Sequence, residues 1–356
     1  MIMKIQIIGG GIIGASTAYH LSLVKGLDIT LFEKDLVYTN ASFARSCGGF
    51  RHQFSCESNI RMGMYGLDFI KKHGINFTAN GYLMVFGEEQ KDDHDQSFDL
   101  QKRCGSNAIS AEPHELLTLF PWLNVDDVYR AVYTQDGSEG WLDPYELQTW
   151  YMKKAKENGI KVIEGDGLKL VDVDSSDAVV ITSGCWTSDV AKNFGIDIPG
   201  KGHKHTVINF KTTHEHIPSM PLIADLITGA YVRPEGPGYI SGHDGNGQWD
   251  SEDLEPNWDH WETHWADLYQ RSSVVFEAIK PVSAWAGYYD TSLIDSNAIV
   301  DSVDKYHFAT GFTGRGLMQS PAIGLALSQQ ILGEKSSFDM SDFLLNRTPN
   351  KEKYVI

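Results

Sequence analysis

The chain has 356 residues and a formal net charge of −17, from 47 acidic and 30 basic residues. This charge argues against nucleic acid and anionic lipid as partners, because a strongly acidic chain repels both. Apolar residues make up 42% and charged residues 22% of the chain, which is an ordinary balance for a globular protein. The length predicts two domains, or one large one with a sizeable core.

The four cysteines are widely spread and form no C-x-x-C pair, which favours reduced thiols. No apolar run approaches the roughly 20 residues of a membrane helix. The residues after Met1 already have the pattern of a strand, so we expect no signal peptide. These features together predict a cytoplasmic protein without a membrane span.

A βαβ unit is predicted at the start of the chain. Residues 4–9 form a short apolar run typical of a strand, residues 12–26 have helical character, and residues 29–34 form a second apolar run. Gly26 follows the helical pattern and is a suitable residue to end the helix. The whole unit has about 30 residues, the usual length for two parallel strands and their crossover helix.

The middle of the chain mixes strands with an amphipathic helix. That helix is predicted over residues 143–159, with Asp143 as its cap and Pro144 in its first turn. Strands are predicted over residues 81–89 and 177–184, and alternating stretches in residues 205–242 favour an antiparallel sheet. Residues 298–333 have the pattern strand, strand, glycine-rich turn and helix.

Two histidines at positions i and i+4, His260 and His264, are arranged as a metal-binding pair on a helix would be. No third ligand is evident, and tryptophans form an apolar stripe on another face of the same helix. We therefore expect a helix that packs through its tryptophans, with solvated histidines and no metal.

Gly9, Gly11 and Gly14 match the pattern G-x-G-x-x-G between the first predicted strand and its helix. In this setting the first glycine makes the turn, the second lets a pyrophosphate approach the backbone, and the third packs the helix on the strand. Glu33 ends the second strand, nineteen residues after Gly14, where a carboxylate accepts hydrogen bonds from ribose hydroxyls. An acid there favours FAD or NAD over NADP; the alternative is an incidental turn with a surface glutamate.

Other stretches resemble one family along nearly the whole chain. The opening glycine motif, residues 42–55 (SFARSCGGFRHQFS), residues 181–190 (ITSGCWTSDV), residues 285–301 (WAGYYDTSLIDSNAIVD) and residues 311–324 (GFTGRGLMQSPAIG) follow one another in the expected order. They resemble the FAD-dependent D-amino acid oxidase superfamily. The branch they resemble most contains sarcosine oxidase, dimethylglycine dehydrogenase and the β subunit of L-proline dehydrogenase.

The resemblance implies an α/β fold, α+β overall, with a Rossmann-like FAD domain assembled from separated segments. It places residues 1–80, 143–205 and 292–356 in that domain. A substrate domain with a large antiparallel sheet would contain residues 81–142 and 206–291. The residues expected to contact FAD are Gly9, Gly11, Ile13, Gly14, Glu33, Lys34, Ser42, Ser46, Gly184, Trp186, Gly314, Arg315, Gly316 and Met318.

Members of this family oxidise a C–N bond by hydride transfer to flavin N5. The expected substrate is an amino acid or N-alkyl amino acid, and the electron acceptor is oxygen, a quinone or another redox protein. Arg51 matches the arginine that binds the substrate carboxylate, and Tyr231, Arg233 and His243 lie on strands expected to face the substrate. The alternatives are that Arg51 contacts FAD or an internal acid, and that the other three point away.

The chain departs from the sarcosine oxidases at three positions. Met318 replaces a lysine that contacts the substrate, and Tyr239 aligns with the lysine that activates oxygen, which favours a dehydrogenase over an oxidase. Gly287 replaces the cysteine that bonds flavin, and no cysteine follows Cys185, so noncovalent FAD is expected. The rival interpretations are an NAD-linked dehydrogenase and a non-catalytic FAD protein used for assembly.

Overall fold

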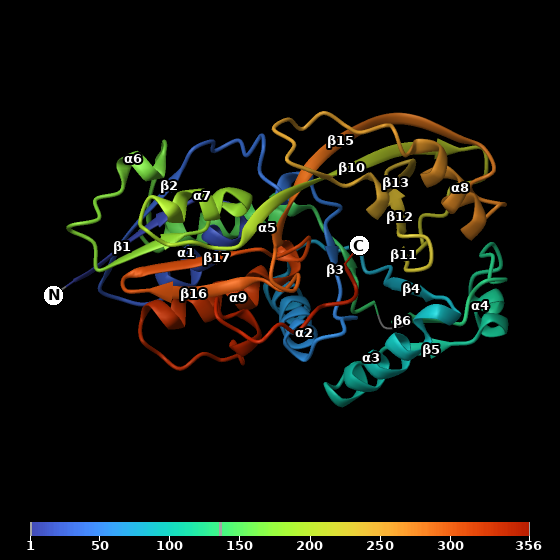
Figure 1. The fold of residues 1–356 in the computed structure, drawn as a ribbon, viewed down its shortest axis with the longest axis horizontal. Helices are drawn as coiled ribbons and strands as arrows, with labels where there is room; N and C mark the ends of the chain where they lie inside the picture. Colours follow the sequence, from blue (N-terminus) through green and yellow to red (C-terminus); the bar gives the residue numbers. More distant parts are fainter. Residues whose placement is uncertain (1, 135–136, 356) are drawn as a thin grey trace.

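The computed structural model describes residues 2–134 and 137–355, whose strands form two large sheets (Figure 1). The first sheet has six strands in the order β16-β17-β9-β1-β2-β8. All neighbours in it are parallel except β16 and β17. Its strands are β1 (Met3–Ile8), β2 (Leu27–Glu33), β8 (Lys161–Glu164), β9 (Ala178–Ile181), β16 (Ile299–Val303) and β17 (Tyr306–Thr310).

Helices cover both faces of this sheet. On one face α1 (Ile12–Ser22) packs between α5 (Pro144–Glu157) and α9 (Gly316–Ile331), and α2 (Glu57–His73) packs on α9. The main hydrophobic core lies among these helices and the sheet. The other face is covered by two short helices, α6 (Gly167–Leu170) and α7 (Thr187–Lys192).

The second sheet has nine strands and is mostly antiparallel. Its path is β14-β10-β13-β12-β11-β4-β6-β5, and β15 pairs with the other edge of β10. Figure 1 shows β10 and β15 as a long ribbon pair that joins the two halves of the molecule. The strands are β4 (Tyr82–Phe86), β5 (Ile109–Ala111), β6 (Arg130–Tyr133), β10 (Gly200–Thr212), β11 (Leu222–Asp225), β12 (Ala230–Glu235), β13 (Gly238–His243), β14 (Gln248–Trp249) and β15 (Ile279–Ser292).

Smaller elements complete the chain. Strands β3 (Gly49–Phe50) and β7 (Gly140–Trp141) form a separate two-stranded sheet. The helices α3 (Lys91–Arg103), α4 (Pro113–Leu119) and α8 (Trp261–Arg271) belong to the half that contains the second sheet (Figure 1). The 3₁₀ turns are η1 (Phe43–Arg45), η2 (Glu88–Gln90), η3 (Gly184–Trp186), η4 (Asp244–Asn246) and η5 (Ser341–Phe343).

The predicted fold class is confirmed, and so are the signals that placed several elements. The β1–α1–β2 unit has the parallel pairing expected for βαβ. The Asp143 carboxylate accepts a 2.9 Å hydrogen bond from the Tyr145 backbone N–H, so it caps α5 as predicted. The division into two domains stays a prediction, and its boundary at residue 205 falls inside β10.

The expectation for α8 is wrong in one respect. The His264 ring is buried and bonds to the Ser241 hydroxyl at 2.6 Å, whereas Trp258 and Trp265 are each at least 40% exposed. The helix therefore packs through His264 and Leu268. The polar His264 ring can be buried there because the Ser241 hydroxyl is its hydrogen-bond partner. Among the described residues, no cluster of histidine, cysteine and acidic side chains is suited to a metal ion.

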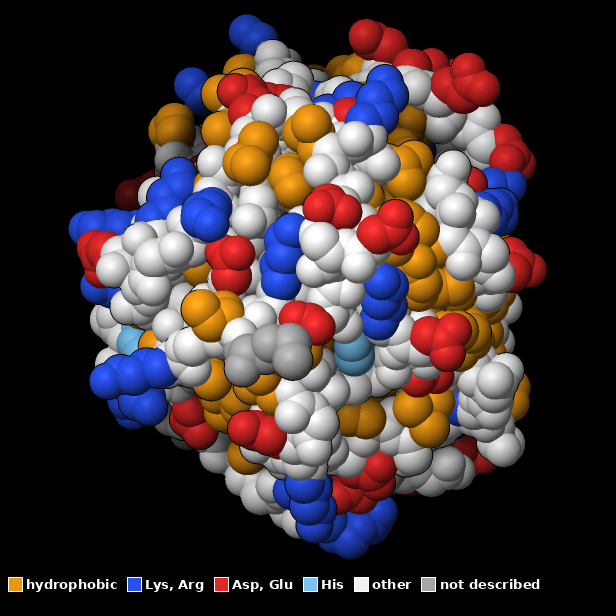
Figure 2. Space-filling model, turned by 90° about the vertical axis from the view of Figure 1, so that its left-hand side faces the viewer, with side chains coloured by type: hydrophobic (Ala, Val, Ile, Leu, Met, Phe, Trp, Pro, Cys, Tyr) orange, Lys and Arg blue, Asp and Glu red, His pale blue; other side chains and the backbone are white. Residues whose placement is uncertain are grey.

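Charges are interspersed on the face shown in Figure 2, where Lys and Arg lie among Asp and Glu. Over residues 2–134 and 137–355, no helix is both long enough and apolar enough to cross a membrane. The cytoplasmic location stays a prediction.

Candidate active site

A cavity of about 800 Å³ lies where the two sheets meet. Its wall includes the carboxyl ends of β1, β2 and β9, the first residues of α1 and α9, and part of β15. The crevice at the carboxyl ends of parallel strands is the usual binding place in open α/β sheets. The volume is near the upper end of the range of about 300–1,000 Å³ for ligand pockets.

The three glycines of the opening motif have different surroundings. Gly9 has a φ of +101°, and a Cβ there would lie 2.6 Å from the Thr182 carbonyl oxygen. A Cβ on Gly14 would lie 1.9 Å from the Gly9 carbonyl oxygen, so this glycine allows α1 to approach β1. A Cβ on Gly11 would have no atom of the described residues within 4 Å, because Gly11 faces the open cavity. The amides of the α1 N-terminus are therefore accessible to an anion.

The Glu33 carboxylate lies at the same end of the cavity. Its Oε2 accepts a 2.6 Å hydrogen bond from the Gly10 N–H, and its Oε1 accepts one of 3.0 Å from the Asp35 N–H. These two bonds hold the carboxylate in the cavity wall beside Lys34. Each oxygen keeps acceptor capacity for a hydroxyl group.

Arg51 lies in the wall at the other end, near β3, and is buried. Its Nη2 donates a 2.6 Å hydrogen bond to the Tyr354 carbonyl, and its Nη1 donates to the Gln53 carbonyl. The guanidinium also lies 4.1 Å from the centre of the Phe54 ring. Among the described residues no carboxylate forms an ion pair with Arg51, and burial lowers its pKa.

Arg315 is a second buried arginine in the wall, just before α9. Its Nη1 and Nη2 donate to the Thr313 and Ser296 carbonyls, and its buried Nε has no hydrogen-bond partner among the described residues. Burial lowers the pKa of Arg315 to about 10; the Glu352 carboxylate opposes this shift, and the Arg51 charge adds to it. Two cations thus share this end of the cavity.

Of the other three residues expected to face the substrate, one lies in the cavity wall and two do not. Tyr231 lies in the cavity wall, and burial raises its pKa. His243 does not, because it bonds to Asp267 on α8 at 2.8 Å, on the opposite side of the second sheet. Arg233 lies behind the wall, where its Nε donates to the Cys47 carbonyl at 2.8 Å and its Nη1 pairs with Glu235. His243 and Arg233 are therefore not in the wall of this cavity, contrary to the expectation, and a role for either with the substrate stays a prediction.

Tyr239 is also misplaced by the sequence alignment. Its ring packs with Phe210 and Phe276 in the core between the second sheet and α8, away from the cavity. Strand alternation explains why Tyr239 and His243 both lie away from the cavity. They are an even number of residues apart and therefore share one face of β13.

The residues predicted to contact the cofactor gather around the one cavity, with the exception of Gly14, which packs α1 on β1. Those in the wall are Gly9, Gly11, Ile13, Glu33, Lys34, Ser42, Ser46, Gly184, Trp186, Gly314, Arg315, Gly316 and Met318. Their contacts with a bound cofactor stay predictions.

Comparison with known protein families decides the identity of this cavity. The family model described as FAD dependent oxidoreductase matches residues 4–330. The chain belongs to this family. FAD is therefore the cofactor of this FAD-dependent oxidoreductase, and the NAD-linked alternative is set aside.

Relatives and solved structures agree with this assignment. FAD-dependent oxidoreductase domain-containing protein 1 of Xenopus laevis is 29% identical, over 98% of this chain and 83% of that protein. Mitochondrial dimethylglycine dehydrogenase of Rattus norvegicus is 24% identical, over 96% of this chain and 44% of that protein. The fold is similar to that of L-proline dehydrogenase from P. horikoshii, with a TM-score of 0.84, 24% identity and 96% coverage of both chains.

The residues of the FAD-dependent oxidoreductase fit its cofactor. The open position beside Gly11 and the amides of the α1 N-terminus suit the pyrophosphate. Glu33 suits the ribose, and the buried, unpartnered Nε of Arg315 is a donor available to a ligand. FAD supplies the redox chemistry, and the chain supplies binding and orientation.

Several wall residues were missed by sequence reasoning. Tyr289 lies within a stretch that carried the family resemblance, but Tyr82 was noted only as part of a strand. Tyr354 and Val355 reach the cavity from the last described residues, and no motif marks them. Their contribution depends on the path of the chain rather than on a local pattern.

Proposed function

We propose that the protein oxidises the C–N bond of an amino acid or N-alkyl amino acid, with the hydride passing from the α or N-alkyl carbon to flavin N5. The observation that carries the proposal is Arg51, a buried cation in the cavity wall with no carboxylate partner among the described residues. A buried charge is normally paired, so this guanidinium suits an anionic group brought by the substrate.

A carboxylate is the anion that fits this position. Two of the Arg51 nitrogens already donate to carbonyls, which fixes the plane of the guanidinium. Nη1 also contacts the Met84 sulfur at 3.7 Å, so Nε and the second Nη2 proton are the donors left for the substrate, and this edge of the guanidinium can hold both oxygens of a carboxylate. The buried hydroxyl group of Tyr231 lies in the same cavity wall and suits the amine end of the substrate.

We further propose noncovalent FAD and a dehydrogenase. Gly287, in the place of the flavin-bonding cysteine, lies in the wall, and the cysteine there is Cys47, from another segment. Among the described residues the one lysine in the wall is Lys34, beside the ribose-binding Glu33. A lysine at the opposite end, which the related oxidases use with oxygen, is thus absent from the described wall.

The test is anaerobic bleaching of the bound flavin by a panel of amino acids and N-alkyl amino acids. The proposal expects at least one member to reduce the flavin, and expects the reduced protein to react faster with a quinone or dye than with oxygen. A flavin that no member bleaches would favour the alternative role, a non-catalytic FAD protein in assembly. Rapid reoxidation by oxygen would instead identify an oxidase.

A further inference from the structure

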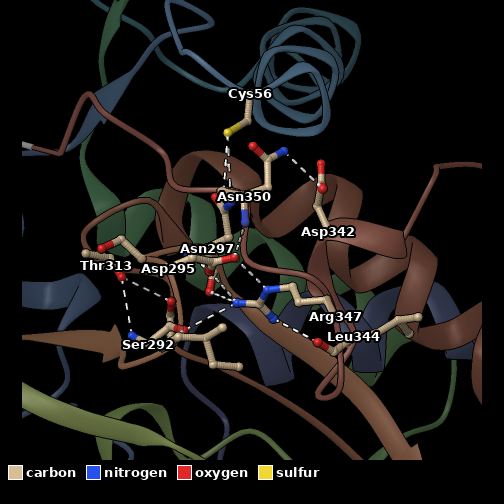
Figure 3. Close-up of polar contacts among 12 residues, drawn as sticks. Cys56, Ser292, Asp295, Asn297, Thr313, Asp342, Leu344, Arg347 and Asn350 are labelled. Carbon is tan, nitrogen blue, oxygen red and sulfur yellow. Dashed lines mark hydrogen bonds and ion pairs between the residues drawn. The ribbon is translucent and has the colours of Figure 1, made fainter.

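The last described residues are held against the body of the protein by a buried ion pair. The Arg347 guanidinium bonds to the Asp295 carboxylate through Nε at 2.9 Å and Nη2 at 2.6 Å (Figure 3). The Asn350 N–H donates to the same carboxylate at 2.9 Å, and the Asn297 amide donates to the Asn350 carbonyl. Residues 347–350 are thereby fixed beside the N-terminus of α2, where Cys56 lies (Figure 3).

Glu352 holds the next part of this segment. Its carboxylate is fully buried and accepts five hydrogen bonds. Oε1 accepts from Ser55 N (2.9 Å), Ser55 Oγ (2.7 Å) and Tyr354 N (3.1 Å), and Oε2 accepts from Cys56 N (3.1 Å) and Asn59 Nδ2 (2.8 Å). Each oxygen therefore faces donors only, a setting that a carboxylate satisfies and an amide does not.

Tyr354 then joins the segment to the cavity. Its hydroxyl donates a 2.8 Å hydrogen bond to the Asp93 carbonyl of α3, and its ring is 2% exposed. Its own carbonyl oxygen accepts the 2.6 Å bond from Arg51 Nη2. Tyr354 and Val355 both form part of the cavity wall.

The orientation of Arg51 depends on this contact. Its other contacts are the Gln53 carbonyl and the Phe54 ring, from its own stretch of chain, and the Met84 sulfur on β4, which lies 3.7 Å from Nη1. The Tyr354 carbonyl, 303 positions along the sequence, is the oxygen acceptor that fixes the guanidinium from another side. Glu352 does not touch Arg51, so it acts on Arg51 through the position of Tyr354 and through its charge.

We propose that residues 347–355 position Arg51 for the substrate carboxylate, and that Glu352 is the positioning residue that locks this segment in place. The inference rests on the proposed function, because it takes Arg51 as the carboxylate anchor. It adds a residue that touches neither substrate nor FAD, and a segment outside the stretch matched by the family model.

The test measures the binding of propanoate, a simple carboxylate, to the FAD-loaded protein through the change in flavin absorbance. Glu352→Gln places an amide NH₂ against existing donors and should raise the propanoate Kd about tenfold or more, with FAD content unchanged. Glu334→Gln makes the same change at an exposed site and should leave the Kd unaltered. Arg51→Lys is the reference for a lost anchor, and no turnover is needed.

Tryptic cleavage at Lys351 and Lys353 gives a second readout. Because binding and segment docking are linked, propanoate should slow cleavage of the wild type, and Glu352→Gln should be cleaved faster. Tyr354→Phe removes only the hydroxyl contact with α3 and should shift both readouts in the same direction by less. This milder variant keeps the inference testable if Glu352→Gln folds poorly.

The outcomes separate the inference from the function on which it rests. If Arg51→Lys weakens propanoate binding and Glu352→Gln does not, the positioning role is wrong while the carboxylate anchor stands. If Arg51→Lys binds propanoate as the wild type does, Arg51 is not the anchor, and both the inference and that part of the proposed function are overturned.

Discussion

At the scale of single residues, the two ends of the cavity differ in the charge they present. Glu33 offers acceptors to the ribose end, and the two buried arginines offer cations to the other end. The chain as a whole has a net charge of −17, so the cationic end is a local feature, formed by two buried arginines that make no ion pair with any described residue. Each charge can be tested by a substitution with a matched control.

Replacing Glu33 with alanine should weaken FAD binding by about 1.5–3 kcal/mol, the usual loss for a charged hydrogen bond. The control is Glu164→Ala, since Glu164 is the register partner of Glu33 on β8 but is exposed and outside the cavity wall. Isothermal titration of each apoprotein with FAD measures the difference. Equal dissociation constants in the two variants would show that Glu33 does not bind the ribose.

Replacing Arg51 with alanine should lower kcat/KM for a carboxylate-bearing amine by about 30- to several-thousand-fold, since losing one partner of a buried charge pair costs about 2–5 kcal/mol. Arg51→Lys should recover part of the loss, because an ammonium does not form the bidentate contact. Rates of flavin reduction in both variants, with FAD content measured alongside, test this. Loss of FAD from Arg51→Ala would instead place Arg51 in the cofactor site.

The buried carboxyl group of Asp290 should make the folding stability of the apoprotein depend on pH. Burial raises the pKa of this cavity-wall carboxyl to about 6, so the folded state binds its proton more tightly than the unfolded state. The stabilisation that this bound proton gives the folded state is fully present below about pH 4, and it is lost as the pH rises through about 6. Asp290→Asn should therefore stabilise the apoprotein relative to wild type at pH 7.5 more than at pH 4, by about 3 kcal/mol at most. Urea unfolding at both pH values checks this; an equal difference at both would contradict it.

Among the elements, the β1–α1 turn contains one glycine that serves folding and another that serves binding. Gly14 lets the helix approach the strand, whereas Gly11 borders open cavity. The sequence pattern alone predicted this division of roles, because the chemistry of a phosphate-binding turn requires it.

Gly14→Ala should destabilise the apoprotein, since its Cβ would lie 1.9 Å from a backbone oxygen. Gly11→Ala should leave apoprotein stability nearly unchanged, as no protein atom lies within 4 Å, and should weaken FAD binding. Thermal unfolding of both apoproteins and FAD titration of Gly11→Ala measure the two effects. A strongly destabilised Gly11→Ala apoprotein would contradict the open position.

Other elements show where sequence reasoning fails. Residues 4–34 were predictable because glycines, apolar runs and a terminal acid all agree on one local unit. His243 and Tyr239 were misjudged because the face that a strand residue occupies depends on register, which an alignment with uncertain loop lengths does not fix. Arg233 shares a face of β12 with Tyr231, but its guanidinium is bonded to the Cys47 carbonyl behind the wall. Tyr354 was unpredictable, since its place in the cavity follows from the buried Glu352 and Arg347 contacts rather than from a motif.

At the scale of the whole molecule, the fold brings a nucleotide site on one sheet and a cationic pocket beside the other into one cavity. We expect FAD to be held in this cavity without a covalent bond. Acid precipitation of the purified protein should release FAD into the supernatant, since no cysteine follows Cys185 in the sequence. Flavin retained in the pellet would contradict noncovalent binding.

We propose that the cavity brings FAD together with a carboxylate-bearing amine. The most direct measurement is the anaerobic rate of flavin reduction by an N-alkyl amino acid and by the matched amine without its carboxylate. We expect the amino acid to reduce the flavin at least about 30-fold faster at equal low concentration, because its carboxylate can pair with Arg51 and the matched amine has none. Equal rates for the two compounds, or no reduction by any amino acid, would contradict it.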